Sequence, residues 1–173
     1  VQLAAPKFSE YPAVRLAALP RAAALQPDAD VRLDRDRVAL VAALAGEPSF
    51  AGRFSIVRVS CADATRADCE AAAVLDLALG RAAWPAPLNP LPSACGARSA
   101  LQFRRDSRLM TISARDGEQA VTRYYVWDGE AARLTLVATL ASAVGTRCGA
   151  PAAKPEGTPP PPGAPAPASP AVP

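Results

Sequence analysis

Residues 50–79 restrict the fold of this chain more than any other stretch of the sequence. They form two apolar runs separated by a short polar segment. In the first run Phe54 and Ile56 fall on one side of an extended chain, and Val57 and Val59 fall on the other. Three leucines repeat at every second position of the second run: Leu75, Leu77 and Leu79. Because a period of two is typical of strands, the stretch predicts a β-hairpin.

A cysteine stands at each end of the polar segment, Cys61 before it and Cys69 after it. Antiparallel pairing brings these two positions together, so we expect a disulfide that pins the hairpin. The chain has four cysteines, for which three pairings are possible. We predict Cys61 with Cys69 and Cys95 with Cys148, because Cys95 and Cys148 both lie in segments without a strand ladder to fix them.

Four short stretches of the chain resemble a family of small, uncharacterised exported proteins of Gram-negative bacteria. They are the cysteine pair and the segments Ser-Phe-Ala-Gly-Arg-Phe at 49–54, Asp-Ser-Arg-Leu at 106–109 and Tyr-Tyr-Val-Trp-Asp-Gly at 124–129. The similarity covers about residues 35–140. Arg53 stands where the family often has histidine, and residues 62–68 replace a tighter turn between the cysteines. The resemblance implies an exported α+β domain and supplies no known catalytic residue.

The segment before the hairpin predicts an extended arm and then one helix. Prolines punctuate residues 1–33, which favours an extended chain with one short strand near residues 14–19. Asp34 then precedes an apolar run that ends before Gly46, and its carboxylate suits a helix N-cap. The stripe that we expect this helix to bury consists of Val38, Leu40, Val41 and Leu44.

Residues 80–98 contain four prolines and cannot form a central strand, so they predict a long loop. Trp84, Leu88 and Leu91 give this loop apolar side chains to bury. Two interpretations stay open: the loop covers a face or edge of the sheet, or it binds a partner through an exposed apolar patch.

Residues 101–140 predict a meander of four antiparallel strands. We expect an Asp-Gly turn at Asp128 between the last two strands, because aspartate and glycine tolerate the positive φ of tight hairpin turns. Tyr125 and Trp127 project to one face of the third strand. We interpret this aromatic pair as cross-strand packing, with partner binding as the alternative.

The composition changes abruptly after Cys148, where prolines, alanines and glycines predict a polyproline-type or disordered tail. The predicted organisation is an extended arm at 1–33, a single domain at 34–148 and a proline-rich tail at 149–173. The domain is expected to be α+β, a mainly antiparallel sheet of about six strands with one packed helix and disulfide staples.

The sequence lacks the residues that several classes of function require. The chain has no histidine, which excludes Ser-His-Asp triads, Cys-His dyads and imidazole metal sites. Its net charge of +3 is spread thinly, so nucleic-acid binding is not expected. No cofactor, metal ligand set or catalytic residue is predicted, and no apolar run is long enough to span a membrane. Acidic residues beside the cysteines leave one catalytic alternative, a carboxylate-based hydrolase that uses Asp63, Asp68 and Glu70.

The even cysteine count and the absence of an initiator methionine at Val1 favour a periplasmic or secreted protein. The function that we expect is non-catalytic: an accessory protein of the cell envelope that binds a protein partner, docked through its proline-rich tail. An inhibitor or immunity protein directed against a secreted enzyme is the alternative within binding. The partner-binding candidates are Trp84, Leu88, Leu91, Tyr125 and Trp127.

Overall fold

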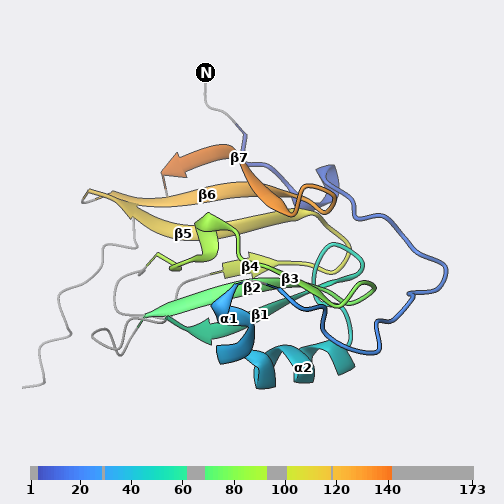
Figure 1. The fold of residues 1–173 in the computed structure, drawn as a ribbon. Helices are drawn as coiled ribbons and strands as arrows, with labels where there is room; N and C mark the ends of the chain where they lie inside the picture. The colour runs from blue at the N-terminus through green and yellow to red at the C-terminus, as the bar shows by residue number, and fades with distance from the viewer. Residues whose placement is uncertain (1–3, 29, 62–68, 93–100, 118, 142–173) are drawn as a thin grey trace, which may run out of the picture.

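The computed structural model describes residues 4–28, 30–61, 69–92, 101–117 and 119–141, which form three stacked layers (Figure 1). Helices form one outer layer, a three-stranded antiparallel sheet lies in the middle, and a four-stranded antiparallel sheet forms the other outer layer. The helices are α1 (Val31–Arg35) and α2 (Arg37–Ala45), with 3-10 turns η1 (Phe8–Glu10) and η2 (Ala86–Leu88). The strands are β1 (Phe54–Ser60), β2 (Glu70–Asp76), β3 (Arg81–Ala83), β4 (Leu101–Phe103), β5 (Leu109–Asp116), β6 (Gln119–Asp128) and β7 (Arg133–Ala141).

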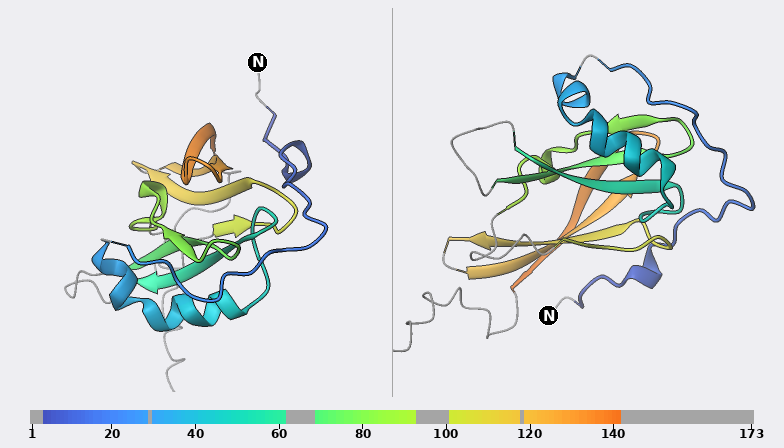
Figure 2. Two further views of the ribbon diagram at one scale, coloured as in Figure 1. Left: turned by 45° about the vertical axis from the view of Figure 1, so that its right-hand side comes forward. Right: turned by 90° about the horizontal axis from the view of Figure 1, so that it is seen from below.

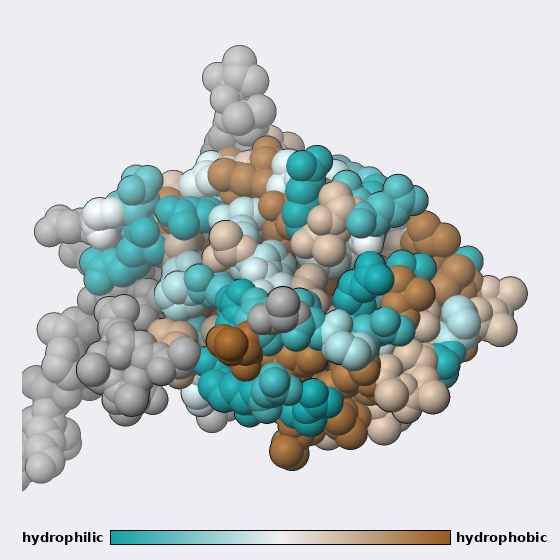
Figure 3. Space-filling view, viewed as in Figure 1, coloured by the Kyte–Doolittle hydropathy of each residue, from teal (hydrophilic) through white to brown (hydrophobic). Residues whose placement is uncertain are grey.

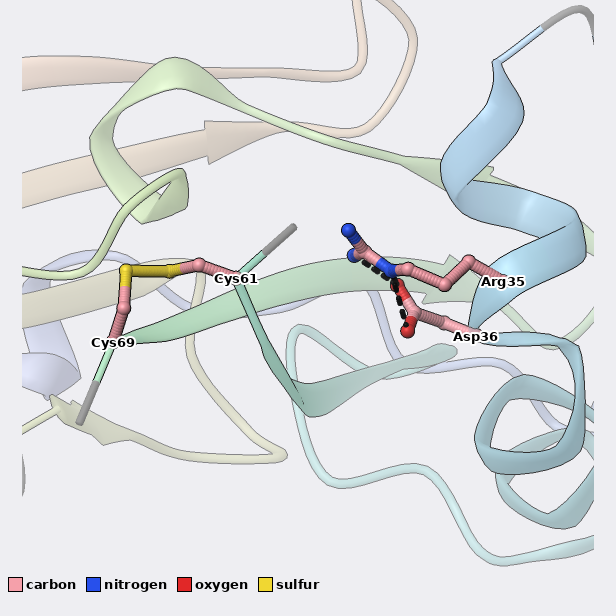
Figure 4. Close-up of a disulfide and its surroundings, with 4 residues drawn as sticks. All are labelled: Arg35, Asp36, Cys61 and Cys69. Atoms are coloured by element: carbon pink, nitrogen blue, oxygen red, sulfur yellow. Dashed lines mark hydrogen bonds and ion pairs between the residues drawn. A yellow bond between two sulfur atoms is a disulfide. The ribbon is translucent and has the colours of Figure 1, made fainter. Parts of the chain in front are cut away.

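The middle sheet is built on the predicted hairpin. β1 pairs with β2 over its full length, from Phe54 opposite Asp76 to Ser60 opposite Glu70. The next residue on either side of this ladder is a cysteine, and Cys61 and Cys69 form the predicted disulfide with their Cα atoms 5.3 Å apart (Figure 4). The hairpin and its disulfide are therefore confirmed.

Both faces of this hairpin are buried, and each face belongs to a different core. Phe54, with Ile56 partly buried beside it, faces a core that lies between the two sheets. Val57, with Val59 partly buried beside it, faces a second core under the helices. A strand that packs on both faces needs apolar residues at successive positions, which is why β2 carries the run from Ala71 to Leu75.

The second sheet has the order β4-β5-β6-β7 and corresponds to the predicted meander. Its inner face contributes aromatic and aliphatic side chains to the core between the sheets, namely Leu101, Met110, Ile112, Tyr125 and Trp127. The ring centroids of Trp127 and Phe54 lie 5.5 Å apart in an edge-to-face arrangement, which joins the two sheets.

The architecture differs from the prediction in two respects. We expected one sheet of about six strands, whereas the described residues form seven strands in two sheets. The additional strand, β3, lies at the edge of the middle sheet. It ends before Pro85, the first proline of the 80–98 segment, so no proline removes a backbone N–H from its pairing with β2. Two short helices also take the place of the single predicted helix.

The helical layer corrects the predicted cap and the predicted buried stripe. Asp30 caps α1 by accepting a hydrogen bond from the Arg32 backbone N–H, whereas Asp34 lies inside α1. Leu40 and Leu44 are buried as expected. Val38 and Val41, also predicted to be buried, are 87% and 50% exposed. Because α2 is apolar nearly all round, its periodicity did not identify the face that packs on the middle sheet. The right-hand view of Figure 2, from below, shows how α2 lies across this sheet.

The expected strand at residues 14–19 is absent from the described N-terminal segment. One isolated bridge joins Pro12 to Ser107 instead, and the chain then runs around one side of the molecule without regular structure (Figure 1). The segment then joins the middle sheet through two hydrogen bonds, from the Ala22 N–H to the Leu77 carbonyl and from the Gln26 N–H to the Gly80 carbonyl. The Asp128 turn also differs, since the residue with positive φ is Ala132.

Three predictions fall outside the described residues. These are the Cys95–Cys148 disulfide, the carboxylates Asp63 and Asp68, and the proline-rich tail. Within the described ranges, no helix is long and apolar enough to cross a membrane.

Candidate binding cleft

The structure places most of the predicted binding residues in the core between the two sheets. Leu88 is fully buried, Leu91 is 5% exposed, Tyr125 is 8% exposed and Trp127 is 1% exposed. η2 directs Leu88 into this core, and the Leu91 N–H donates a hydrogen bond to the Glu70 carbonyl. In this conformation the 80–92 segment covers the sheets, as the first interpretation expected, and leaves these side chains little surface for a partner.

Trp84 lies apart from the other four candidates, against the core under the helices. The guanidinium carbon of Arg32 stands 5.0 Å from the centroid of its ring, a cation–π contact. Its indole nitrogen is buried and has no hydrogen-bond partner among the described residues. Trp84 therefore joins α1 to the end of β3 and does not meet Tyr125 or Trp127.

A different set of residues surrounds an open cleft of about 420 Å³ at one end of the two sheets. The cleft draws on three parts of the chain that are distant in sequence: the N-terminal segment, the start of β1, and the loops that flank β5 and β6. Its lining consists of Val14, Leu16, Ala51, Arg53, Phe54, Arg108, Trp127, Asp128, Gly129 and Glu130.

The turn before β1 brings these parts together. The Ala51 N–H and the Gly52 N–H donate hydrogen bonds to the carbonyls of Arg104 and Arg105, 3.2 and 2.6 Å away, which docks the turn on the loop before β5. Gly52 has a φ of +87°, a conformation that L side chains rarely adopt. A Cβ there would stand 2.7 Å from the Val14 carbonyl oxygen, so the absence of a side chain lets the N-terminal segment pass closely over the turn.

Aromatic side chains form the floor of the cleft. The Phe54 and Trp127 rings meet edge to face, and the 129–132 turn lies against both rings. A Cβ added at Gly129 would stand 2.8 Å from Phe54 Cζ and 3.5 Å from Trp127 Nε1. The Trp127 indole nitrogen therefore lies beside Gly129 and the Phe54 ring, which together enclose it.

Two buried donors at the cleft lack an acceptor. Trp127 Nε1 and Arg53 Nε have no hydrogen-bond partner among the described residues. An unmet buried donor costs about 1–3 kcal/mol, and with Trp84 Nε1 these are the three unpaired buried side-chain donors among the described residues. The rest of the Arg53 guanidinium is held in place, since its Nη2 lies 2.9 Å from Oδ2 of the buried Asp76.

Charges of both signs stand at the rim. Within the described part of the chain, the Arg108 guanidinium has no ion pair or hydrogen bond. Asp128 Oδ1 accepts the N–H groups of Glu130 and Ala131, each 3.0 Å away, and these bonds, that of Ala131 first, lower the pKa of Asp128. Asp128 is therefore ionised at neutral pH, and the carboxylate of Glu130 stands exposed beside it.

The N-terminal segment gives the cleft an apolar lip. Val14 and Leu16 are 71% and 43% exposed, although both are aliphatic. The same two residues line a second hollow of about 600 Å³, which lies between the N-terminal segment and the loop at Arg105. Residues 14–16 thus stand between two hollows, with apolar side chains available to a partner. Figure 3 shows further exposed apolar side chains at the lower edge of the molecule, over α2, away from this lip.

Of the five predicted binding residues, only Trp127 lines the cleft. Most other residues of the cleft lining come from three of the stretches quoted for the family resemblance: 49–54, 106–109 and 124–129. Val14 and Leu16 had no such signal. No group of three metal-ligating side chains occurs within the residues that the structure describes.

Comparisons of this chain with protein-family models, with curated proteins and with solved structures find no match. What the cleft does is therefore inferred from its own residues.

Proposed function

We propose that this protein is an exported, non-catalytic binding protein of the cell envelope, and that it holds a protein partner at the cleft. The observation that carries the proposal is the exposed pair Val14 and Leu16 beside an aromatic floor. Exposed aliphatic side chains around a concave surface are typical of sites that bury a partner's side chain.

The chemistry of the cleft favours binding over hydrolysis. A carboxylate-based hydrolase needs one carboxyl group whose pKa is raised, so that it donates a proton at neutral pH. Backbone hydrogen bonds instead lower the pKa of Asp128, so Asp128 does not suit the role of that proton donor. Glu70, the one described member of the predicted acidic group, lies 3.4 Å from Arg58, which suits a strand-end ion pair.

Export is supported by the Cys61–Cys69 disulfide, because such bonds persist in oxidising compartments. The proline-rich segment 149–173 is proposed as a second docking element, since a polyproline segment loses little entropy on binding. The partner is then an envelope complex or, for an inhibitor, one secreted enzyme.

The proposal is tested by capture of the partner from the native envelope with matched double variants. Val14→Ser with Leu16→Ser removes the apolar lip, and Val38→Ser with Leu79→Ser removes two comparably exposed side chains elsewhere, at 87% and 46% exposure. We expect the wild type and the second variant to capture the same stoichiometric partner and the first variant to lose it.

Equal capture by both double variants would refute binding at the cleft. A variant that ends at residue 149 tests the proline-rich segment as a second docking element. Loss of this segment should reduce capture of the partner without lowering the melting temperature. Whether the captured protein is a structural complex or a single secreted enzyme decides between the accessory role and inhibition.

A further inference from the structure

We propose that the cleft receives an extended peptide segment of the partner, held by its main-chain amide groups and by one apolar side chain. The inference rests on the proposed function and specifies the group that is bound. The hydrogen-bonding groups of the cleft, its charges and its apolar lip together suit one kind of ligand.

The unmet donors require an acceptor. Trp127 Nε1 and Arg53 Nε have no partner, and Trp127 is 1% exposed, so solvent does not satisfy its N–H in this conformation. Gly129 and the Phe54 ring enclose this indole N–H, because a Cβ at Gly129 would stand 2.8 Å from Phe54 Cζ and 3.5 Å from Trp127 Nε1. Binding of a carbonyl oxygen at this N–H therefore requires the 129–132 turn, which has no side chain at Gly129, to move outward.

The rim supplies the complementary acceptors. Asp128 uses Oδ1 for its own turn, while its Oδ2 and the Glu130 carboxylate accept no hydrogen bond from any other described residue. Each peptide unit carries one acceptor and one donor. A peptide carbonyl oxygen can therefore accept from the unpaired donors at the floor of the cleft, and a peptide N–H can donate to the carboxylates at its rim.

The mixture of charges disfavours a ligand of one sign. Arg108, Asp128 and Glu130 line the same cleft, so a carboxylate that approaches Arg108 also meets the two acidic side chains, and an ammonium group that approaches Asp128 meets Arg108. The charge of Arg53 is already balanced by Asp76 at 2.9 Å. A neutral amide has no such repulsion, because it presents both a donor and an acceptor without net charge.

The apolar lip accounts for the side chain of the bound segment. Val14 and Leu16 face the hollow together with Phe54 and leave aliphatic surface uncovered. A volume of about 420 Å³ suits a short stretch of peptide and falls in the usual range of ligand pockets. The ligand class is therefore an extended peptide with an aliphatic residue at its centre.

The test is an NMR titration of the full chain carrying Trp84→Phe, in which Trp127 is the one remaining tryptophan. The probe is the capped peptide acetyl-Ala-Leu-Ala-amide, and the signal is the indole ¹H–¹⁵N resonance of Trp127. We expect a saturable shift whose Kd changes little between about 50 and about 500 mM NaCl, because neutral groups are not screened. Leu16→Ser should weaken binding about tenfold through lost apolar burial. The control Leu79→Ser, at a similar exposure, should leave the Kd unchanged.

Three results would overturn the inference. They are no shift of the Trp127 indole resonance, a Kd that rises steeply with salt, and tighter binding of acetyl-leucine, whose carboxylate is charged, than of the capped peptide. If the capped peptide does not bind while partner capture still depends on Val14 and Leu16, the peptide inference fails and the proposed function stands. If capture is insensitive to those residues, the proposed function fails by its own test.

Discussion

Gly80 offers a sharp test of how the N-terminal segment is attached to the middle sheet. Its φ is +67°, and a Cβ at this position would stand 2.2 Å from the Ala24 carbonyl oxygen. Gly117 has a similar φ of +60°, but a Cβ there would meet nothing within 4 Å. Alanine at the two positions therefore imposes the same backbone strain, and only Gly80→Ala adds a steric clash.

The expected magnitudes follow from these contacts. A non-glycine residue in the left-handed region costs about 1–2 kcal/mol, which is the full effect expected for Gly117→Ala. In Gly80→Ala the Ala24 backbone must also move by about 1 Å to reach ordinary contact. This movement strains the hydrogen bonds Ala22 N–H to Leu77 and Gln26 N–H to Gly80, each contributing about 1 kcal/mol. We expect Gly80→Ala to lower the free energy of unfolding by about 3–4 kcal/mol.

Urea unfolding of the two variants measures the difference, which should be about 2 kcal/mol with equal m-values. Limited trypsin digestion gives a local readout, because Arg21 binds the Leu44 and Gly46 carbonyls and is protected only while the segment is docked. Cleavage after Arg21 should accelerate in Gly80→Ala and not in Gly117→Ala. Equal stability and equal cleavage rates in the two variants would refute the close approach of Ala24 to the β2–β3 turn.

Two further predictions concern the disulfide and the α1 cap. Replacing Cys61 and Cys69 together with serine should lower the free energy of unfolding, measured in urea, by about 2.5 kcal/mol, the chain-entropy value for so short a loop. Asp30→Ala should cost about 1 kcal/mol at pH 7, because the N-cap acceptor is lost. Hydrogen bonds from the Arg32 side chain lower the pKa of Asp30 from 3.8 to about 2, so the stability that this carboxylate contributes is complete above pH 3.8 and is lost as the pH falls through about 2. A difference between Asp30→Ala and wild type that persists unchanged well below that pH would contradict the assignment.

Short-range sequence patterns were sufficient to predict the β1–β2 hairpin and its disulfide. The period of two in β1 identified the hairpin and the faces of Phe54 and Val57, and the cysteines at its mouth identified the disulfide. The division into two sheets was missed, although β2 carried a signal for it. Five successive apolar residues from Ala71 to Leu75 are typical of a strand packed on both faces, and hence of a third layer.

Periodicity alone could not orient α2, because both of its faces are apolar. The larger leucines at 40 and 44 are buried, whereas the valines at 38 and 41 are exposed. The turn after Asp128 was located correctly but with the wrong backbone geometry. Four residues connect β6 to β7, and the positive φ falls on Ala132 at the end of the turn.

The cleft could not be predicted from local patterns, because the contacts that form it are long-range. Val14 reaches Gly52 only because η1 and Pro12 are anchored at the loop before β5, where the buried Ser107 hydroxyl lies 2.8 Å from the Phe8 carbonyl oxygen and 2.9 Å from that of Tyr11. The Arg108 N–H then donates to Tyr11, and its carbonyl accepts from the Trp127 N–H. One short loop thus connects the N-terminal segment to the end of β6.

This connection links the fold to the proposed binding. The hydrogen bonds that position the apolar lip at Val14 run through the loop that carries Arg108, and the same loop fixes Trp127 at the floor. A partner segment that enters the cleft therefore contacts two elements whose spacing is set by one set of backbone hydrogen bonds. Gly52 sets the third wall, because its missing Cβ lets the Val14 backbone approach the turn before β1. Pre-organisation of this kind lowers the entropy lost on binding, so a short aliphatic segment can be held by few contacts, provided that the Trp127 indole N–H beside Gly129 obtains its acceptor.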